Sequence, residues 1–167
     1  MKVRAGWAVA VLFLVFSVCL AAGNQPITIV AFGKPKDPPR DVKFKRDVQR
    51  SKDVWYCATK LDDFKNDETH AIRTYNAKAG DIVQVFDANA GVAAVNPDKD
   101  DWFKVTFKRD VAERTFELEE LRAYGHNPVQ GNGGTKYTYE DADVKIELWW
   151  KSNLSDKVTS IHVTTVQ

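Results

Sequence analysis

The chain of 167 residues carries 24 lysine and arginine residues against 23 aspartate and glutamate residues, a net charge of +1, and 44% of its residues are hydrophobic. This length and composition allow one compact domain with its own hydrophobic core. The charge balance provides no basic field that would collect nucleic acid and no polybasic patch for a membrane surface, so neither is expected as a partner.

The N-terminal segment has the layout of a secretory signal peptide. Lys2 and Arg4 form a positively charged start, residues 7–22 are almost continuously apolar, and small residues follow where a peptidase would cut. We therefore predict that residues 1–23 are removed and that a periplasmic or secreted protein begins near Asn24. The alternative is an uncleaved membrane anchor, because the apolar run is close to the shortest length that spans a bilayer.

Removal of this segment leaves 22 basic and 23 acidic residues and takes away Cys19, one of the two cysteines. Cys57 then has no partner for an internal disulfide, and export without disulfides is more typical of a bacterial envelope than of animal secretion. We expect Cys57 to be a small buried hydrophobic residue. The alternative is a nucleophile, which would need a histidine base from among His70, His126 and His162.

The mature chain is predicted to be all-β. Short segments of β-prone residues, several of them strictly alternating, are separated by turns rich in Gly, Pro, Asn and Asp. The only helical signal is a single turn near residues 118–122. The predicted strands are residues 27–32, 54–58, 82–86, 102–107, 116–118, 143–151 and 158–166.

Three parts are expected in the mature chain. Residues 24–52 are predicted to hold one short strand and a tether rich in proline and charge, because prolines and charges prevent regular strand pairing. Residues 53–125 are predicted to form the main domain. Residues 126–167 are predicted to be a glycine-rich connection and a C-terminal β-hairpin, with turn residues at 152–156.

Four short motifs occur in the order and spacing of a known small barrel. They are an opening strand at 61–64, a Gly-Asp turn with the following strand at 78–85, a tryptophan strand at 101–105 and a closing strand at 116–121. In these motifs the segment from residue 58 to residue 124 resembles the Src-homology-3-like barrels, including the bacterial export-associated variety. The resemblance implies a small closed barrel over residues 53–125.

The segment departs from those members of the family that bind polyproline. Asp62 stands in place of the first tyrosine of the opening strand, and residues 117–121 contain neither the proline nor the tyrosine of the closing turn. Without these side chains the groove for a polyproline helix is incomplete. The resemblance therefore implies the role of the bacterial relatives, which is binding to the cell wall or to a protein partner.

Trp102 is the main candidate for a binding residue. Alternation along residues 102–107 sends Phe103 inward, so Trp102 lies on the outer face of its strand, where a large aromatic side chain is a candidate anchor. The alternative is that the C-terminal hairpin covers Trp102 in a second core. Trp149 faces away from the apolar face of its strand and is a further candidate. The adjoining loop adds three carboxylates that would select a cationic ligand: Asp98, Asp100 and Asp101.

No pattern in the sequence indicates catalysis, a metal or a cofactor. The acidic loop includes Lys99 and lacks the alternating oxygen ligands of a calcium loop. We therefore expect no enzyme activity and predict an exported binding or accessory module that recognises a cell-wall component or a protein partner. The alternative is a secreted inhibitor of a hydrolase, such as a lytic enzyme or a protease, which would insert residues 87–101 into a foreign active site.

Overall fold

The computed structural model describes residues 25–33, 41–57, 69–87, 100–118, 126–131, 133–151 and 158–167. The predicted signal peptide, the proline-rich part of the tether, Asp98 and most of the predicted helical turn lie outside these residues.

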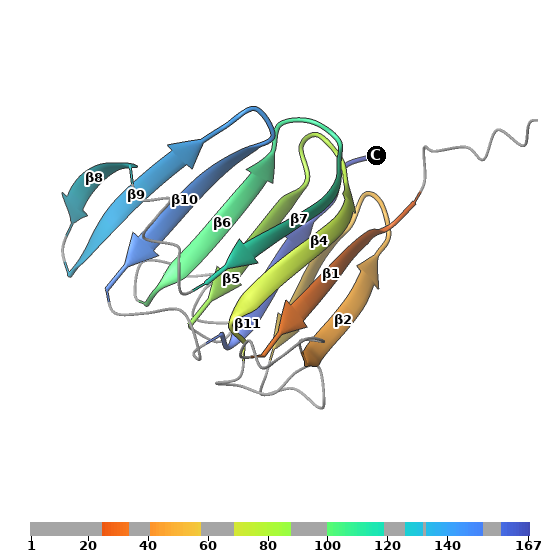
Figure 1. The fold of residues 1–167 in the computed structure, drawn as a ribbon, viewed down its shortest axis with the longest axis horizontal. Helices are drawn as coiled ribbons and strands as arrows, with labels where there is room; N and C mark the ends of the chain where they lie inside the picture. The colour runs from red at the N-terminus through yellow and green to blue at the C-terminus, as the bar shows by residue number, and fades with distance from the viewer. Residues whose placement is uncertain are drawn as a thin grey trace, which may run out of the picture.

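The described strands form two antiparallel sheets, which lie against each other as a sandwich (Figure 1), so the all-β prediction is confirmed. The smaller sheet has the order β2-β1-β4-β7 and the larger sheet has the order β3-β11-β5-β6-β10-β9-β8. The smaller sheet contains β1 (Ile27–Phe32), β2 (Val42–Val48), β4 (Ala71–Ala77) and β7 (Val111–Glu117). The larger sheet contains β3 (Asp53–Cys57), β5 (Ile82–Phe86), β6 (Trp102–Phe107), β8 (His126–Gly131), β9 (Gly134–Glu140), β10 (Val144–Trp150) and β11 (Ser160–Thr164).

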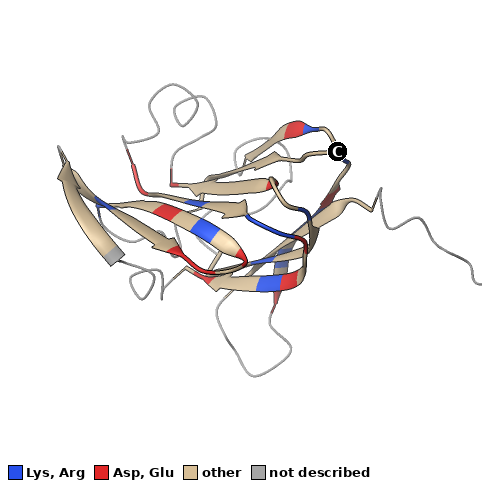
Figure 2. Ribbon diagram, turned by 90° about the horizontal axis from the view of Figure 1, so that it is seen from above, with Lys and Arg blue, Asp and Glu red and all other residues tan. Residues whose placement is uncertain are grey.

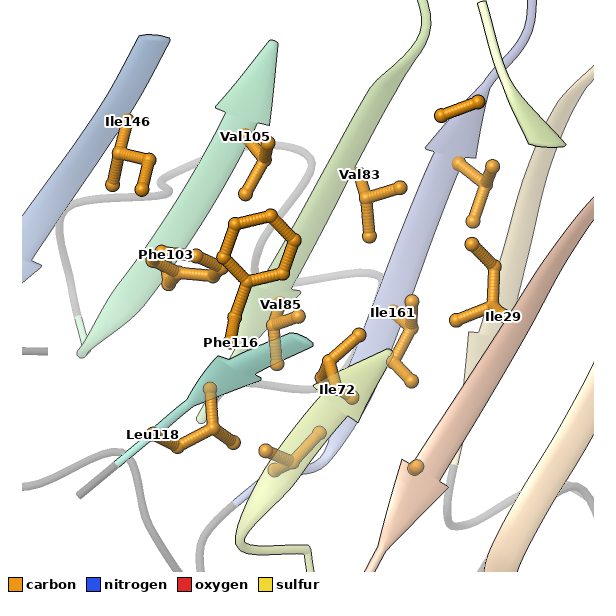
Figure 3. Packing of buried hydrophobic residues seen from close by; sticks show 14 of the residues in the cluster. Ile29, Ile72, Val83, Val85, Phe103, Val105, Phe116, Leu118, Ile146 and Ile161 are labelled. Atoms are coloured by element: carbon orange, nitrogen blue, oxygen red, sulfur yellow. The ribbon is translucent and has the colours of Figure 1, made fainter. Parts of the chain in front are cut away.

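The hydrophobic core lies between the inner faces of the two sheets (Figure 3). Successive side chains of a strand point to opposite faces, and β6 shows the pattern that the sequence predicts. Phe103, Val105 and Phe107 are fully buried, while Lys104 on the other face is partly exposed. Phe116 of β7 reaches across from the smaller sheet, with its ring centroid 5.5 Å from that of Phe103. The predicted register of β6 is therefore confirmed.

This register predicts different effects for two neighbouring substitutions in β6. Val105→Ala should lower the free energy of unfolding by about 2 kcal/mol, because it removes buried methyl groups and leaves a cavity. Lys104→Ala, on the outer face, should change it by no more than about 0.5 kcal/mol. Urea denaturation of both variants measures the difference, and equal losses would contradict the assigned faces.

The strands of residues 53–125 do not close into a barrel in the described part of the chain. β4 and β7 belong to the smaller sheet, while β3, β5 and β6 belong to the larger one. The reason is that several strand partners come from distant segments: β1 pairs with β4, and β11 lies between β3 and β5. Strands from all three expected parts of the chain therefore share the two sheets.

The prediction of a C-terminal β-hairpin is wrong. β10 pairs with β6 and β9, whereas β11 pairs with β3 and β5, so two strands separate them in the larger sheet. Both strands have apolar inner faces, and these central positions bury them against the smaller sheet. The predicted glycine-rich connection instead contains β8 and the start of β9, which form a hairpin at the edge of the larger sheet.

Candidate functional site

The outer face of the larger sheet carries a second group of aromatic side chains, separate from the core. Its members come from five strands. We call them the aromatic cluster: Trp55, Phe86, Trp102, Trp149 and His162. Trp102 lies opposite Phe86 of β5 and opposite Trp149 of β10, while His162 of β11 lies opposite Trp55 of β3. The tertiary fold thus brings the two tryptophans predicted from the sequence together as cross-strand neighbours.

Trp102 and Trp149 are almost fully buried, with 7% and 8% of their surfaces exposed. Of the two alternatives for Trp102, a second core therefore agrees with the structure, although the β8–β9 hairpin supplies part of the cover. A methyl group at Gly131 or Gly134 would lie 2.4 or 2.8 Å from the indole of Trp149. The Trp149 ring therefore fills the room that these two glycines leave.

The acidic loop contributes to the fold at the end of β6. Asp101 is buried, its carboxylate accepts a hydrogen bond from the backbone N–H of Lys151, and its carbonyl accepts one of 2.9 Å from the N–H of Asp87. Asp100 is partly exposed. Asp101 therefore joins the ends of β5, β6 and β10, and its carboxylate is directed at the backbone of β10.

Charged residues border the aromatic cluster. Oε1 of Glu147 lies 3.2 Å from Nζ of Lys136, and Oε2 of Glu147 lies 3.8 Å from Nζ of Lys104. The Lys136 ammonium also lies 5.9 Å from the centre of the Trp102 ring. Burial by itself would raise the pKa of Glu147, but the hydrogen bond from Lys136 and the charges of Lys136, Lys145 and Lys104 hold it below its usual value. Glu147 therefore remains a carboxylate between two lysines, and Lys136 occupies the face of Trp102.

Opposite charges are interspersed over the rest of the described strands (Figure 2). This distribution agrees with a net charge close to zero and gives no large field of one sign for a ligand of opposite charge.

The solvent-accessible part of the aromatic cluster lies at β3. The Trp55 ring is stacked on His162, with ring centroids 4.2 Å apart and an angle of 8° between the planes, and it also stacks on Phe86 at 5.4 Å. Nε2 of His162 is hydrogen-bonded to Asp53, whose side chain is 67% exposed. Asp53, Trp55 and His162 therefore form an accessible group at the margin of the cluster.

The sequence reasoning did not find this accessible group. Asp53 and Trp55 are two positions apart in a β-prone segment, and that spacing places them on one face of a strand. This was the only local signal, because His162 lies 109 residues from Asp53 in the chain.

Cys57 is buried, which confirms the prediction of a small buried residue. Its partner across the β3–β11 ladder is Ser160, and His162 lies two pairs further along, opposite Trp55. The tertiary fold thus places a histidine on the strand beside Cys57. The His162 ring, however, is stacked on Trp55 and bonded to Asp53. This arrangement favours a packing role for the thiol.

Two hollows of about 450 and 310 Å³ lie elsewhere on the described surface. Their charged side chains pair within the protein: Arg50 with Asp81 at 2.6 Å and Lys78 with Asp110 at 2.7 Å. Across the described ranges, no group of three or more His, Cys, Asp and Glu side chains is placed to hold a metal ion. The same ranges contain no helix long and apolar enough to cross a membrane.

No family model, curated protein or solved structure matches this chain. Its fold and site define a protein of two antiparallel sheets in which the outer face of the larger sheet carries an aromatic cluster with one accessible margin.

Proposed function

We propose that the chain is an exported, non-enzymatic binding module of a bacterial envelope that recognises a cell-wall component or a protein partner. It acts in the periplasm or outside the cell after removal of residues 1–23, and it uses no cofactor and binds no nucleic acid. The observation that supports this proposal best is the aromatic cluster on the face of the larger sheet that points away from the core, accessible at Trp55 and His162.

The core between the two sheets is separate from this cluster. The inner faces of both sheets already bury a continuous set of apolar side chains, among them Phe103 and Ile161, each fully covered. Binding sites for small ligands are lined mainly by aromatic and apolar groups with a few placed polar groups. Rings at the margin of an outer sheet face, beside the exposed carboxylate of Asp53, supply both kinds of group.

Sedimentation with purified cell wall tests this proposal. We expect the mature chain, starting at Asn24, to pellet with the wall fraction and to leave the rate of a wall-lytic enzyme unchanged. A chain immobilised on beads and exposed to an envelope extract provides the parallel test for a protein partner.

The outcomes separate the two functions considered from the sequence. Inhibition of the lytic enzyme without pelleting would replace the binding module by the hydrolase inhibitor. A chain that binds neither the wall nor an envelope protein would reject the binding module.

A further inference from the structure

Trp55 is placed at the open edge of the larger sheet. It is the middle residue of β3, the edge strand, and its ring packs toward β11 and β5, where His162 and Phe86 lie. No described strand flanks β3 on its other side, and no further described ring stacks on Trp55. The indole is therefore partly exposed at the open edge of the sheet.

Asp53 supplies an oriented carboxylate on the same face of β3. It precedes Trp55 by two residues, which is about 6.7 Å along a strand. Nε2 of His162 and the hydroxyl of Thr164, the latter at 3.4 Å, both bond to its Oδ1. No hydrogen bond from a described residue reaches Oδ2, and the side chain is largely exposed. Two neighbours thus hold the carboxylate in place while one oxygen remains available to a ligand.

These two groups match the chemistry of a sugar residue. The face of an aromatic ring carries partial negative charge, which attracts the weakly positive C–H groups on one side of a pyranose ring. The hydroxyl groups at the rim of the same sugar are hydrogen-bond donors, and an ionised carboxylate accepts such bonds strongly. One sugar residue stacked on Trp55 can therefore also reach Oδ2 of Asp53.

We propose that Trp55 and Asp53 form a saccharide-binding site and that the ligand is a glycan chain of the cell wall. Trp55 provides the stacking surface, Asp53 accepts hydroxyl groups, and His162 positions both through its ring contact and its hydrogen bond. This proposal rests on the function proposed above and narrows its ligand to a sugar polymer.

Calorimetric titration of the mature chain with soluble peptidoglycan glycan fragments, chitotetraose and cellotetraose tests the site. We expect at least one of these saccharides to bind. Trp55→Ala should weaken that binding by about 30-fold, as is typical of an aromatic anchor. Asp53→Asn, a surface change that keeps the side-chain shape, should weaken it by about tenfold through loss of the charged acceptor.

Two further variants serve as controls. Lys145→Ala replaces an exposed residue on the outer face of β10, several strands away, and should leave the affinity unchanged. Trp55→Phe keeps an aromatic ring and should bind more tightly than Trp55→Ala. Because Asp53 is largely exposed, Asp53→Asn leaves the packing at this edge in place and decides the question if Trp55→Ala fails to fold.

Three results would overturn the saccharide site. The first is saccharide binding that Asp53→Asn leaves undiminished and that is equally strong in Trp55→Phe and in a folded Trp55→Ala variant. The second is a chain that pellets with the wall but binds none of the three saccharides, which leaves the binding module intact. The third is that the immobilised chain binds no saccharide but retains an envelope protein, and that this retention is lost in Trp55→Ala. That result would assign the site at Trp55 to a protein partner.

Discussion

We expect Asp81→Ala to lower the free energy of unfolding by about 3–5 kcal/mol, because it leaves Arg50 as a buried charge without its partner. The two side chains are 0% and 6% exposed and lie 2.6 Å apart. Urea denaturation followed by circular dichroism measures the loss. A decrease below about 1 kcal/mol, typical of a surface ion pair, would contradict this assignment.

The large expected effect has a second cause, because Asp81 also satisfies backbone groups. Its carboxylate accepts hydrogen bonds from the N–H of Lys78 at 2.8 Å and from the N–H of Val166 at 3.0 Å. Arg50 in turn donates to the carbonyl of Gln25 at 2.7 Å. The pair therefore connects the turn between β4 and β5 to the residues after β2, before β1 and after β11.

Asp110→Ala is the matched control for Asp81→Ala. The hydrogen bond from Lys78, together with one from the backbone of Ala79, holds the pKa of Asp110 below its usual value, but the carboxylate is exposed to solvent. We expect this substitution to leave the unfolding curve unchanged. In addition, a double variant in which apolar residues replace Arg50 and Asp81 should recover part of the stability lost in Asp81→Ala, because no unpaired charge remains.

Trp102→Ala should lower the free energy of unfolding by about 3–5 kcal/mol, since it removes a large buried ring from the aromatic cluster. The ring contacts Phe86 and Trp149 on the two neighbouring strands, so its loss leaves a cavity on the outer face of the larger sheet. Chemical denaturation measures this effect. Trp102→Phe, which retains part of the ring, should cost less.

Val129→Ala is the control for Trp102→Ala. Val129 lies on the edge strand β8 and is exposed, so its substitution should change the free energy of unfolding by no more than about 0.5 kcal/mol. If Trp102→Ala kept full stability and lost wall binding, Trp102 would be the exposed anchor that the sequence first suggested.

The strands that the sequence predicted best are those with a clear local pattern. β5 and β6 begin and end at the predicted residues, and β6 has Phe103 and Val105 on the buried face, as strict alternation indicates. Strands without such a pattern were missed. β4 contains Arg73 and ends near Asn76, which has a left-handed backbone with φ of 56°, and β8 and β9 lie in a glycine-rich segment.

The predictions of a barrel and a hairpin rested on local motifs, and such motifs do not specify which strands pair with one another. A single strand can pair along either edge, and turn residues such as those at 152–156 are compatible with several connections. The choice depends on which apolar faces become buried together, and this is a property of the whole chain. The predictions of a barrel and of a C-terminal hairpin therefore failed, although many of the individual strands were predicted correctly.

The amino-acid sequence by itself determined that the chain is all-β and which side chains of β6 face the core, because the two-residue alternation of a strand is a local property. Only the tertiary structure decided the candidate site. Insertion of β11 between β3 and β5 brings His162 against Trp55 and Asp53, and the pairing of β6 with β10 buries Trp102 beside Trp149. These contacts join residues far apart in the chain, and the backbone hydrogen bonds that create them carry no sequence signal of their own.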